Sequence, residues 1–351
     1  MTLCQLRFII QVGDSLSCYY PLKGYECGVN PLTGKKNIKV VPYGSDPWPN
    51  QEPIMIPCGK CIGCRLDYSK QWANRCLLEM MYHERNCFVT LTYDDFHVPH
   101  ARYTDSDSGC LVDNLTLRSR DLQLFVKRLR KYFSPDSIRY FGCGEYGDDT
   151  YRPHYHIVLF GIDFDDKEFY KKSTTGFDIF TSPALTRLWS SPCFGCEGSH
   201  TPVTPTGIAT VQECTYETCA YTARYVMKKL KGAESDFYKE MHIEPPFVRM
   251  SRRPGLGRQY YDDHPDLYNR SSIHVSTLDG GKSFQPPKYF DKLLEVDDPE
   301  LYEVTKYVRK FSADQSQQAR LANTDLDYLG YLALCDENLQ SRIKSLKRSG
   351  S

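Results

Sequence analysis

Several features are missing from this chain of 351 residues. No uninterrupted apolar run approaches the roughly 20 residues that a membrane-spanning helix needs. The first 13 residues hold a short apolar stretch broken by Gln5, Arg7 and Gln11, without the small-residue cleavage site of a secretory signal. Charge of one sign is not in excess either, because 44 basic residues balance 44 acidic ones. We therefore expect no membrane partner, and the total charge gives no argument for nucleic acid.

Local charge and cysteine content are more informative. Basic residues cluster at 127–131, 224–231 and 249–258, and a phosphate-binding groove needs only a local positive patch. The chain has 15 cysteines, but it is long for a disulfide scaffold. We expect free or metal-bound thiols in a reducing cytoplasm.

Hydrophobic periodicity predicts an α+β organisation. Apolar residues spaced three to four apart predict helices over 67–85, 119–133 and 218–230 and in the tail from about 298. Alternating or β-rich runs predict strands over 88–93, 137–144 and 154–160. The stretches 1–65, 94–117 and 163–212 are expected to be mostly irregular.

Two histidines on the last of these strands suggest a metal site. His154 and His156 are two residues apart, so on a strand their side chains share a face. A hairpin with the preceding strand should bring Glu145 close to them. Two imidazoles and a carboxylate leave open positions on a divalent cation, which a scissile phosphate can occupy. Paired histidines on a strand are also found as ordinary surface or core residues.

The segment 221–229 offers a nucleophile. Tyr221 and Tyr225 are four residues apart, so both phenols lie on one face of a helix. Cations follow each of them three residues later, at Arg224 and Lys228. A phenol with a pKa near 10 is a poor nucleophile at neutral pH, but a polarised phosphate and nearby cations favour its attack. Core packing is the alternative for tyrosines at this spacing.

These motifs resemble those of the HUH endonucleases that initiate rolling-circle replication. Six segments, in this order, look like the replication initiator of gokushovirus-type microviruses, which are small single-stranded DNA phages: CGKC at 58–61, FVTLTYDD at 88–95, RYFGCGEYGD at 139–148, RPHYHIVLFG at 152–161, YTARYVMKK at 221–229 and MSRRPGLGR at 250–258. The resemblance covers about residues 16–290.

The resemblance implies roles for individual residues. His154 and His156 would be metal ligands with Glu145 as the third, and the ion would be Mg²⁺ or Mn²⁺. Tyr221 and Tyr225 would be paired nucleophiles, and Lys228 would contact the phosphate or the leaving oxygen. Tyr155 stands where an aliphatic residue is common, but on a strand it points away from the metal.

The run Cys58-Gly-Lys-Cys61-Ile-Gly-Cys64 has zinc-ligand spacing and needs one more ligand. Cys18 aligns with an N-terminal cysteine of the resembled family, and Cys27 is the alternative. We expect a structural zinc site, with unligated thiols as the other interpretation. Cys193 and Cys196 form another CxxC pair, which stays unassigned.

Basic residues near these motifs are predicted to bind DNA. Arginines beside two glycines in the segment 250–258 can bind phosphate closely, although a solvated turn has the same composition. The predicted DNA-binding residues are Arg224, Lys229, Arg252, Arg253 and Arg258.

We predict an HUH-like central antiparallel sheet of about five strands with helices on one face, the metal hairpin at its centre and the tyrosine helix packed across it. The predicted parts are a Cys-rich segment over 1–65, an endonuclease core over 66–290 and a helical tail over 291–351. The expected function is a strand-specific nick in single-stranded or supercoiled origin DNA through a 5′-phosphotyrosine, in the cytoplasm of a bacterial host. No nucleotide-binding motif is visible, so a host helicase and DNA polymerase are expected partners. The alternatives are a zinc-stabilised, non-catalytic single-strand-binding protein and a metal-dependent hydrolase that uses water.

Overall fold

The structure is a computed structural model that describes residues 18–32, 34, 36–42, 45, 47–48, 50–147, 150–173, 176–192, 203–225, 233–277 and 280–348. Within these ranges, the side chains of 192, 203, 224–225, 233–235 and 343–348 are outside the description. The chain divides into two compact units, one formed by Gln5–Tyr68 with Asp291–Ser351 and the other by Ser69–Phe290. The predicted three-part division stays a prediction.

The second unit is built on an antiparallel sheet that has seven strands among the described residues, in the order β14-β7-β8-β4-β13-β10-β9. Its members are β4 (Asn86–Thr92), β7 (Arg139–Tyr146), β8 (Pro153–Phe160), β9 (Glu168–Lys172), β10 (Asp178–Thr181), β13 (Ala209–Glu213) and β14 (Phe247–Met250). The predicted antiparallel sheet is thus present, but it is wider than about five strands. Sequence reasoning missed β9, β10, β13 and β14. Strand β9, for example, is exposed throughout and shows no alternation.

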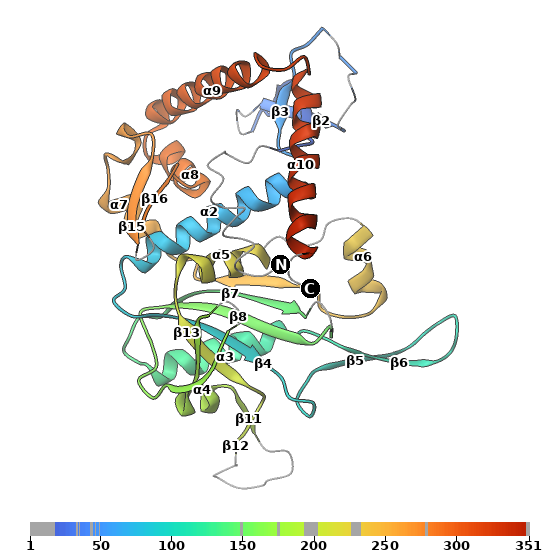
Figure 1. Ribbon diagram of the computed structural model, residues 1–351, viewed down its shortest axis with the longest axis vertical. Helices are drawn as coiled ribbons and strands as arrows, with labels where there is room; N and C mark the ends of the chain where they lie inside the picture. The colour runs from blue at the N-terminus through green and yellow to red at the C-terminus, as the bar shows by residue number, and fades with distance from the viewer. Residues whose placement is uncertain are drawn as a thin grey trace. The chain divides into compact units, whose positions relative to one another are not determined.

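Helices cover both faces of this sheet, so the prediction of helices on one face is wrong (Figure 1). One face packs against α3 (Ser119–Tyr132) and α4 (Pro183–Leu188), through a core that contains Phe125, Leu129 and Leu185. The other packs against α2 (Ile62–Met80) and α5 (Tyr216–Tyr225), through Cys76, Cys219 and Ala223. Cysteine and alanine give a weaker hydrophobic pattern than leucine and phenylalanine, and this second interface was therefore harder to predict.

The predicted helix over 67–85 begins and ends five residues earlier, as α2. Its start falls inside the cysteine run, because Cys64 is already helical. At its end, the side-chain amide of Asn86 donates to the carbonyls of Met80 and His83 at 3.4 and 2.8 Å. These bonds stabilise the turn that follows the helix and leads into β4.

Smaller elements complete the second unit. A hairpin of β5 (His100–Thr104) and β6 (Leu111–Leu115) projects from the end of β4, in a stretch predicted to be irregular (Figure 1). The remaining elements are β11 (Ser190–Pro192), β12 (Val203–Pro205), α6 (Ala233–Glu240), α7 (Arg258–Asp263), η1 (Leu267–Asn269), β15 (Ile273–Thr277) and β16 (Gly280–Phe284).

The first unit combines the two ends of the described chain. It contains a three-stranded sheet of β1 (Leu22–Val29), β2 (Lys36–Val41) and β3 (Ile54–Ile56), which was not predicted. The tail forms α8 (Lys288–Asp297), α9 (Pro299–Leu321) and α10 (Tyr328–Arg348), which confirms the helical prediction. The Tyr20 hydroxyl donates to Asp336 of α10 at 2.6 Å, so the N-terminal segment and the tail are joined directly. None of the helices in the described ranges is both long and apolar enough to cross a membrane.

Candidate metal and nucleophile site

The metal group lies on the neighbouring strands β7 and β8. Glu145 pairs with His154 and Cys143 pairs with His156 in the antiparallel register, so Glu145 and both histidines share one face. The Nε2 atoms of His154 and His156 each lie 2.9 Å from Oε1 of Glu145. All three ligand atoms lie within 4.8 Å of one another. The structure therefore brings together the three residues predicted as metal ligands.

The group is sheltered from water. Glu145 is 1% exposed and His156 is 7% exposed, whereas His154 is half-buried and leaves one side open. Burial raises the pKa of Glu145, but hydrogen bonds and charge from the two histidines lower it by a larger amount. The net pKa is below the ordinary glutamate value. Glu145 is thus an ionised, acceptor-only ligand at neutral pH.

The outer nitrogens of both imidazoles have partners that orient the rings. Nδ1 of His154 donates to the carbonyl oxygen of Arg152 at 3.1 Å, and Nδ1 of His156 lies 3.0 Å from the Thr90 hydroxyl. In neutral His154 the lone pair on Nε2 then faces the Glu145 carboxylate, and a cation between them relieves the repulsion. The donor set of two imidazoles and one carboxylate therefore fits a divalent metal ion.

Thr90 is a site residue that sequence reasoning did not single out. It lies on β4 directly opposite His156. Thr90 belongs to the predicted strand 88–93. Its place beside His156 could be inferred only from the pairing of that strand with 154–160, which was not predicted.

Tyr221 lies against the metal group from α5. Its ring centroid is 5.0 Å from that of His156, with the two planes nearly perpendicular at 88°. Phe88 stacks on His156 with ring centroids 5.5 Å apart, and it also meets Tyr221 edge-on at 6.3 Å, so the three rings form one cluster. These contacts position the tyrosine helix across the β7–β8 hairpin.

The remaining residues of the predicted nucleophile segment are only partly described. Tyr225 is the last residue of α5, one helical turn after Tyr221, and its side chain is outside the description, as is that of Arg224. Lys228 and Lys229 lie outside the described residues.

Tyr155 points to the opposite face of the sheet, as predicted. Its hydroxyl lies 2.7 Å from that of Tyr93 and accepts from the backbone N–H of Arg118 at 3.2 Å. Tyr93 in turn donates to Asp121 at 2.7 Å. The departure from an aliphatic middle residue therefore serves the α3 side of the core and leaves the metal side unchanged.

Four cysteines gather in the first unit. The sulfur atoms of Cys18, Cys58, Cys61 and Cys64 lie within 4.8 Å of one another, with 4.0 Å between Cys58 and Cys64 and 3.9 Å between Cys61 and Cys18. Tetrahedral zinc with bonds of about 2.3 Å separates its sulfurs by about 3.8 Å. Cys27 lies outside this group, and its Sγ faces the carbonyl of Tyr25. Cys193 and Cys196 are outside the described residues.

Backbone N–H groups point at these sulfurs. Cys58 Sγ accepts from Cys61 at 3.3 Å and Lys60 at 3.4 Å, and Cys18 Sγ accepts from Cys58 at 3.1 Å. Burial raises the pKa of Cys18 to about 11. At Cys58, burial also raises the pKa, but the two N–H donors outweigh it and the net pKa falls below the usual value. Such N–H donors support thiolate charge, so this cluster of thiols fits a structural zinc ion.

The basic segment forms the loop that leads from β14 into α7. Arg252 and Arg253 are exposed at its tip, whereas Nε of Arg258 is bonded to Asp262 at 2.7 and 2.9 Å. Of the three arginines in this segment that were predicted to bind DNA, Arg252 and Arg253 are exposed, whereas Arg258 is paired with an aspartate.

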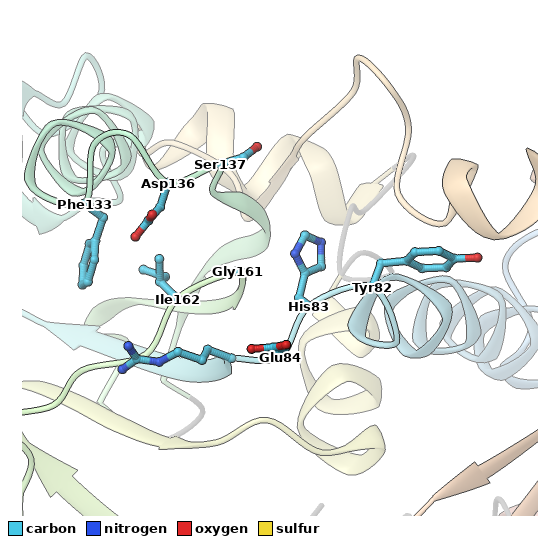
Figure 2. Close-up of a pocket in the computed structure, with 9 residues that line it drawn as sticks. Tyr82, His83, Glu84, Phe133, Asp136, Ser137, Gly161 and Ile162 are labelled. Carbon is cyan, nitrogen blue, oxygen red and sulfur yellow. The ribbon is translucent and has the colours of Figure 1, made fainter. Parts of the chain in front are cut away.

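A pocket of about 400 Å³ lies at the far end of β8 from the metal group. It is lined by residues of the α2–β4 turn, the α3–β7 loop and the segment after β8, including His83, Phe133 and Ile162 (Figure 2). None of the predicted site residues lines it.

A group of one carboxylate and two imidazoles on the sheet, with a tyrosine helix packed against it, is the arrangement that the motifs predicted. The model of the replication-associated protein ORF2 family matches residues 86–230, which include the metal group and both tyrosines. The chain belongs to this family of microvirus replication proteins, which confirms the resemblance drawn from the motifs.

Individual relatives support the same placement. The chain is 34% identical to replication-associated protein ORF2 of Spiroplasma virus 4 over 300 residues, which is 84% of this chain and 85% of the relative. It is 28% identical to replication-associated protein VP4 of Bdellovibrio phage phiMH2K, over 70% of this chain and 69% of the relative. It is also 28% identical to replication-associated protein ORF4 of Chlamydia phage 1, over 68% of this chain and 53% of the relative. No solved structure matches the chain.

Proposed function

We propose that this protein initiates rolling-circle replication by nicking one strand of a phage replication origin, with a tyrosine as the nucleophile. The observation that carries the proposal is the contact of Tyr221 with His156, which places a phenol beside a group suited to hold a divalent metal. Membership of the replication-associated protein family supports the same biological role.

Glu145, His154 and His156 would hold Mg²⁺ or Mn²⁺, and imidazole ligands favour Mn²⁺ chemically. When bound, the ion supplies Lewis-acid polarisation of the scissile phosphate. The hydrogen bond that Nδ1 of His154 donates to the Arg152 carbonyl, and the one between Nδ1 of His156 and the Thr90 hydroxyl, would keep both Nε2 atoms turned toward a bound ion. The protein thereby fixes the phosphate next to α5.

The hydroxyl oxygen of a tyrosine attacks the phosphorus, and the bond from phosphorus to the 3′-oxygen breaks. The phenol proton is lost, the departing 3′-oxygen gains one, and the products are a 5′-phosphotyrosyl adduct and a free 3′-OH. Cations that follow the tyrosines in the chain, Arg224, Lys228 and Lys229, would stabilise the developing charge. A second phenol at Tyr225 would allow the adduct to pass from one tyrosine to the other after a round of synthesis.

The cysteine cluster would hold a structural zinc ion, and the exposed arginines would bind DNA phosphate. Single-stranded or supercoiled origin DNA would be the substrate, in the cytoplasm of a bacterial host. A host helicase and DNA polymerase would unwind and extend the nicked strand.

The test is formation of a covalent adduct. Labelled single-stranded origin DNA is incubated with the protein and Mn²⁺ or Mg²⁺ and analysed on a denaturing gel. We expect an adduct with wild type, reduced adduct with Tyr221→Phe or Tyr225→Phe, and none with the double variant or with His156→Ala.

The outcomes separate the candidate functions. Cleavage without an adduct would indicate a hydrolase that uses water, and binding without cleavage under any metal would indicate a single-strand-binding protein. An adduct formed by the double phenylalanine variant would exclude both tyrosines as the nucleophile. Tyr221→Leu, which also removes the aromatic contact with His156, reports on positioning when compared with Tyr221→Phe.

A further inference from the structure

The loop Ser251–Gly257, between β14 and α7, is held in place by buried charged side chains. Glu79, near the end of α2, is only 4% exposed, and its Oε2 accepts the backbone N–H of Gly257 at 2.6 Å. Its other oxygen accepts from Nε of Arg139, whose Nη2 donates to the carbonyl of Pro254 at 3.0 Å. One buried ion pair therefore holds the loop backbone at two points.

A second set of contacts fixes the loop from the side. Nε and Nη2 of Arg75 donate to the carbonyl of Leu256 at 3.1 and 3.0 Å. The same guanidinium lies 4.2 Å from the ring centroid of Trp72 and 4.0 Å from that of Tyr289. Such stacking of arginine between aromatic rings restricts its motion. The loop backbone is thus bound to a side chain that is itself immobilised.

The two glycines of the loop are required by this packing. A Cβ at Gly255 would lie 2.6 Å from the hydroxyl of Tyr289. Gly257 has a φ of +76°, where side chains are strained. The conformation is therefore specified by both backbone and anchors.

The loop that is fixed in this way carries two positively charged side chains at its tip. Arg252 and Arg253 are exposed, and within the described part of the chain neither has an acidic partner. Arg258 contrasts with them, because Asp262 neutralises it. A binding group that is already ordered loses less conformational entropy when its ligand arrives. Two guanidinium groups on a fixed loop are therefore well suited to bind phosphate.

The loop is placed relative to the metal group by strand β7. Ser251 exchanges two hydrogen bonds with Tyr140, its N–H donating to the carbonyl of Tyr140 and its Oγ accepting the N–H, at 3.0 and 3.1 Å. Tyr140 precedes Glu145 by five residues on the same strand. At about 3.3 Å per residue, the loop base and the metal group are about 17 Å apart along the strand. A strand of DNA stacked at about 3.4 Å per nucleotide covers this distance in about five nucleotides.

We propose that Arg252 and Arg253 form a second phosphate-binding site for the DNA strand that is cut, about five nucleotides from the scissile phosphate, and that Glu79 and Arg75 are positioning residues for it. The inference rests on the proposed function for the identity of the ligand. The substrate would then be a strand that extends past the cut far enough to reach the loop. Arg258 would take no part in this phosphate contact.

Salt dependence of binding tests the site directly. Binding of a labelled single-stranded origin oligonucleotide is measured by fluorescence anisotropy over a range of salt concentrations, without divalent metal. Each phosphate contact on a single strand contributes about 0.7 to the slope of log K against log salt. The slope is negative, and replacing both residues, Arg252→Gln with Arg253→Gln, should reduce its magnitude by about 1.4.

The matched control is Arg270→Gln, which removes another exposed arginine of the same unit, one that pairs with Asp266. It should leave the slope unchanged. An unchanged slope in the double arginine variant, or an equal fall in the control, would overturn the site.

The positioning role is tested by a double-mutant cycle. Glu79→Ala should lower the slope as much as the double arginine variant does, and the combination should lower it no further. A merely structural role predicts weaker binding with an unchanged slope, and that result would overturn the role of Glu79. Gly257→Ala, which disturbs the loop without removing a buried charge, provides the same readout if Glu79→Ala does not fold.

Substrate length and cleavage kinetics separate this inference from the proposed function. With oligonucleotides trimmed in turn on each side of the cut, the double arginine variant should bind more weakly only when the strand reaches the loop. The DNA concentration that gives half-maximal adduct formation should be higher for this variant than for wild type. If wild type forms no adduct, the proposed function alone is contradicted. If wild type forms the adduct but the double arginine variant has the salt slope of wild type, this inference alone is contradicted.

Discussion

The metal group on β7 and β8 and the cysteine cluster of the first unit are built in opposite ways. Glu145, His154 and His156 are placed by the register of β7 and β8, two inner strands of the seven-stranded sheet, which lie between β14 and β4 and pack against a hydrophobic core. Of the four cysteines, Cys18 and Cys58 lie in irregular chain and Cys61 just before a helix. We therefore expect metal at the sheet-based group to serve chemistry, and metal at the cysteine cluster to hold the shape of the surrounding chain.

The largest expected effect is therefore at the cysteine cluster. Removal of zinc with a strong chelator, or Cys61→Ser, should unfold the N-terminal segment, because structural zinc in small sites contributes on the order of 10 kcal/mol to folding. Limited proteolysis should then cut between Cys18 and Cys64, and bound zinc measured by metal analysis should fall from one ion per chain. Cys27→Ser, which changes an exposed thiol outside the cluster, is the control. Resistance to proteolysis without metal would contradict the structural role.

Changing the sheet-based site should give the reverse result. Glu145→Gln keeps the size of the side chain but removes its charge, so metal-dependent adduct formation should fall by two orders of magnitude or more. The melting temperature, measured by circular dichroism, should stay within a few degrees of wild type. A large loss of stability together with a small loss of cleavage would reverse the contrast between the two sites.

A smaller effect is expected one contact further out. Thr90→Val removes the hydroxyl 3.0 Å from Nδ1 of His156 while keeping the shape of the side chain. Partners of metal-bound histidines are worth about 10–100-fold in metal affinity. The Mn²⁺ concentration that gives half-maximal cleavage should rise by that factor, with little change in rate at saturating metal. Thr92→Val, one pleat along β4 and bonded to the Ile208 carbonyl, is a suitable control.

The smallest effect concerns pH and the anchored loop. Burial raises the pKa of Glu79, but His83, the Gly257 N–H and Arg139 lower it by more, so its folded pKa is below the ordinary 4.5. A depressed carboxylate pKa stabilises the fold above the unfolded value, and this contribution is lost as pH falls through the folded value. The free-energy difference between wild type and Glu79→Gln, measured by urea unfolding, should therefore shrink as pH falls below about 4.5. A difference that grows with acidity would contradict this ion pair.

The sequence allowed much of the site to be predicted, and the reasons lie in particular residues. Histidines two apart must share a strand face, and a short hairpin brings the end of the preceding strand beside them, which pointed to Glu145. Zinc spacing in Cys58, Cys61 and Cys64 is local, so it is visible without a fold. Cys18 is 40 residues from Cys58, and only resemblance to the family pointed to it.

Other parts could not be predicted, because they depend on pairings between distant segments. Strand β9 is exposed on every residue and has no alternating pattern, so only its partner β10 identifies it as a strand. The helices over 67–85 and 218–230 were predicted, but not that helices cover both faces of the sheet, because the contacts of α2 and α5 with the sheet use cysteine and alanine as well as aromatic residues. The β1–β3 sheet of the first unit lies in a segment whose turn-rich composition favoured irregular structure.

By itself, the sequence determined which residues are available for the proposed chemistry: two histidines and a glutamate that could hold a divalent metal, tyrosines four residues apart, a run of zinc-spaced thiols and an arginine-rich segment. Each of these is set by spacings of a few residues, over which strand and helix periodicities act directly. Only the tertiary structure decided that Thr90 supports His156, that Tyr221 lies against it, and that Glu79 and Arg75 hold the arginine loop. The hydrogen bonds among these contacts join residues 66 to 181 positions apart. Strand register and helix packing bring them together, and no local pattern encodes them.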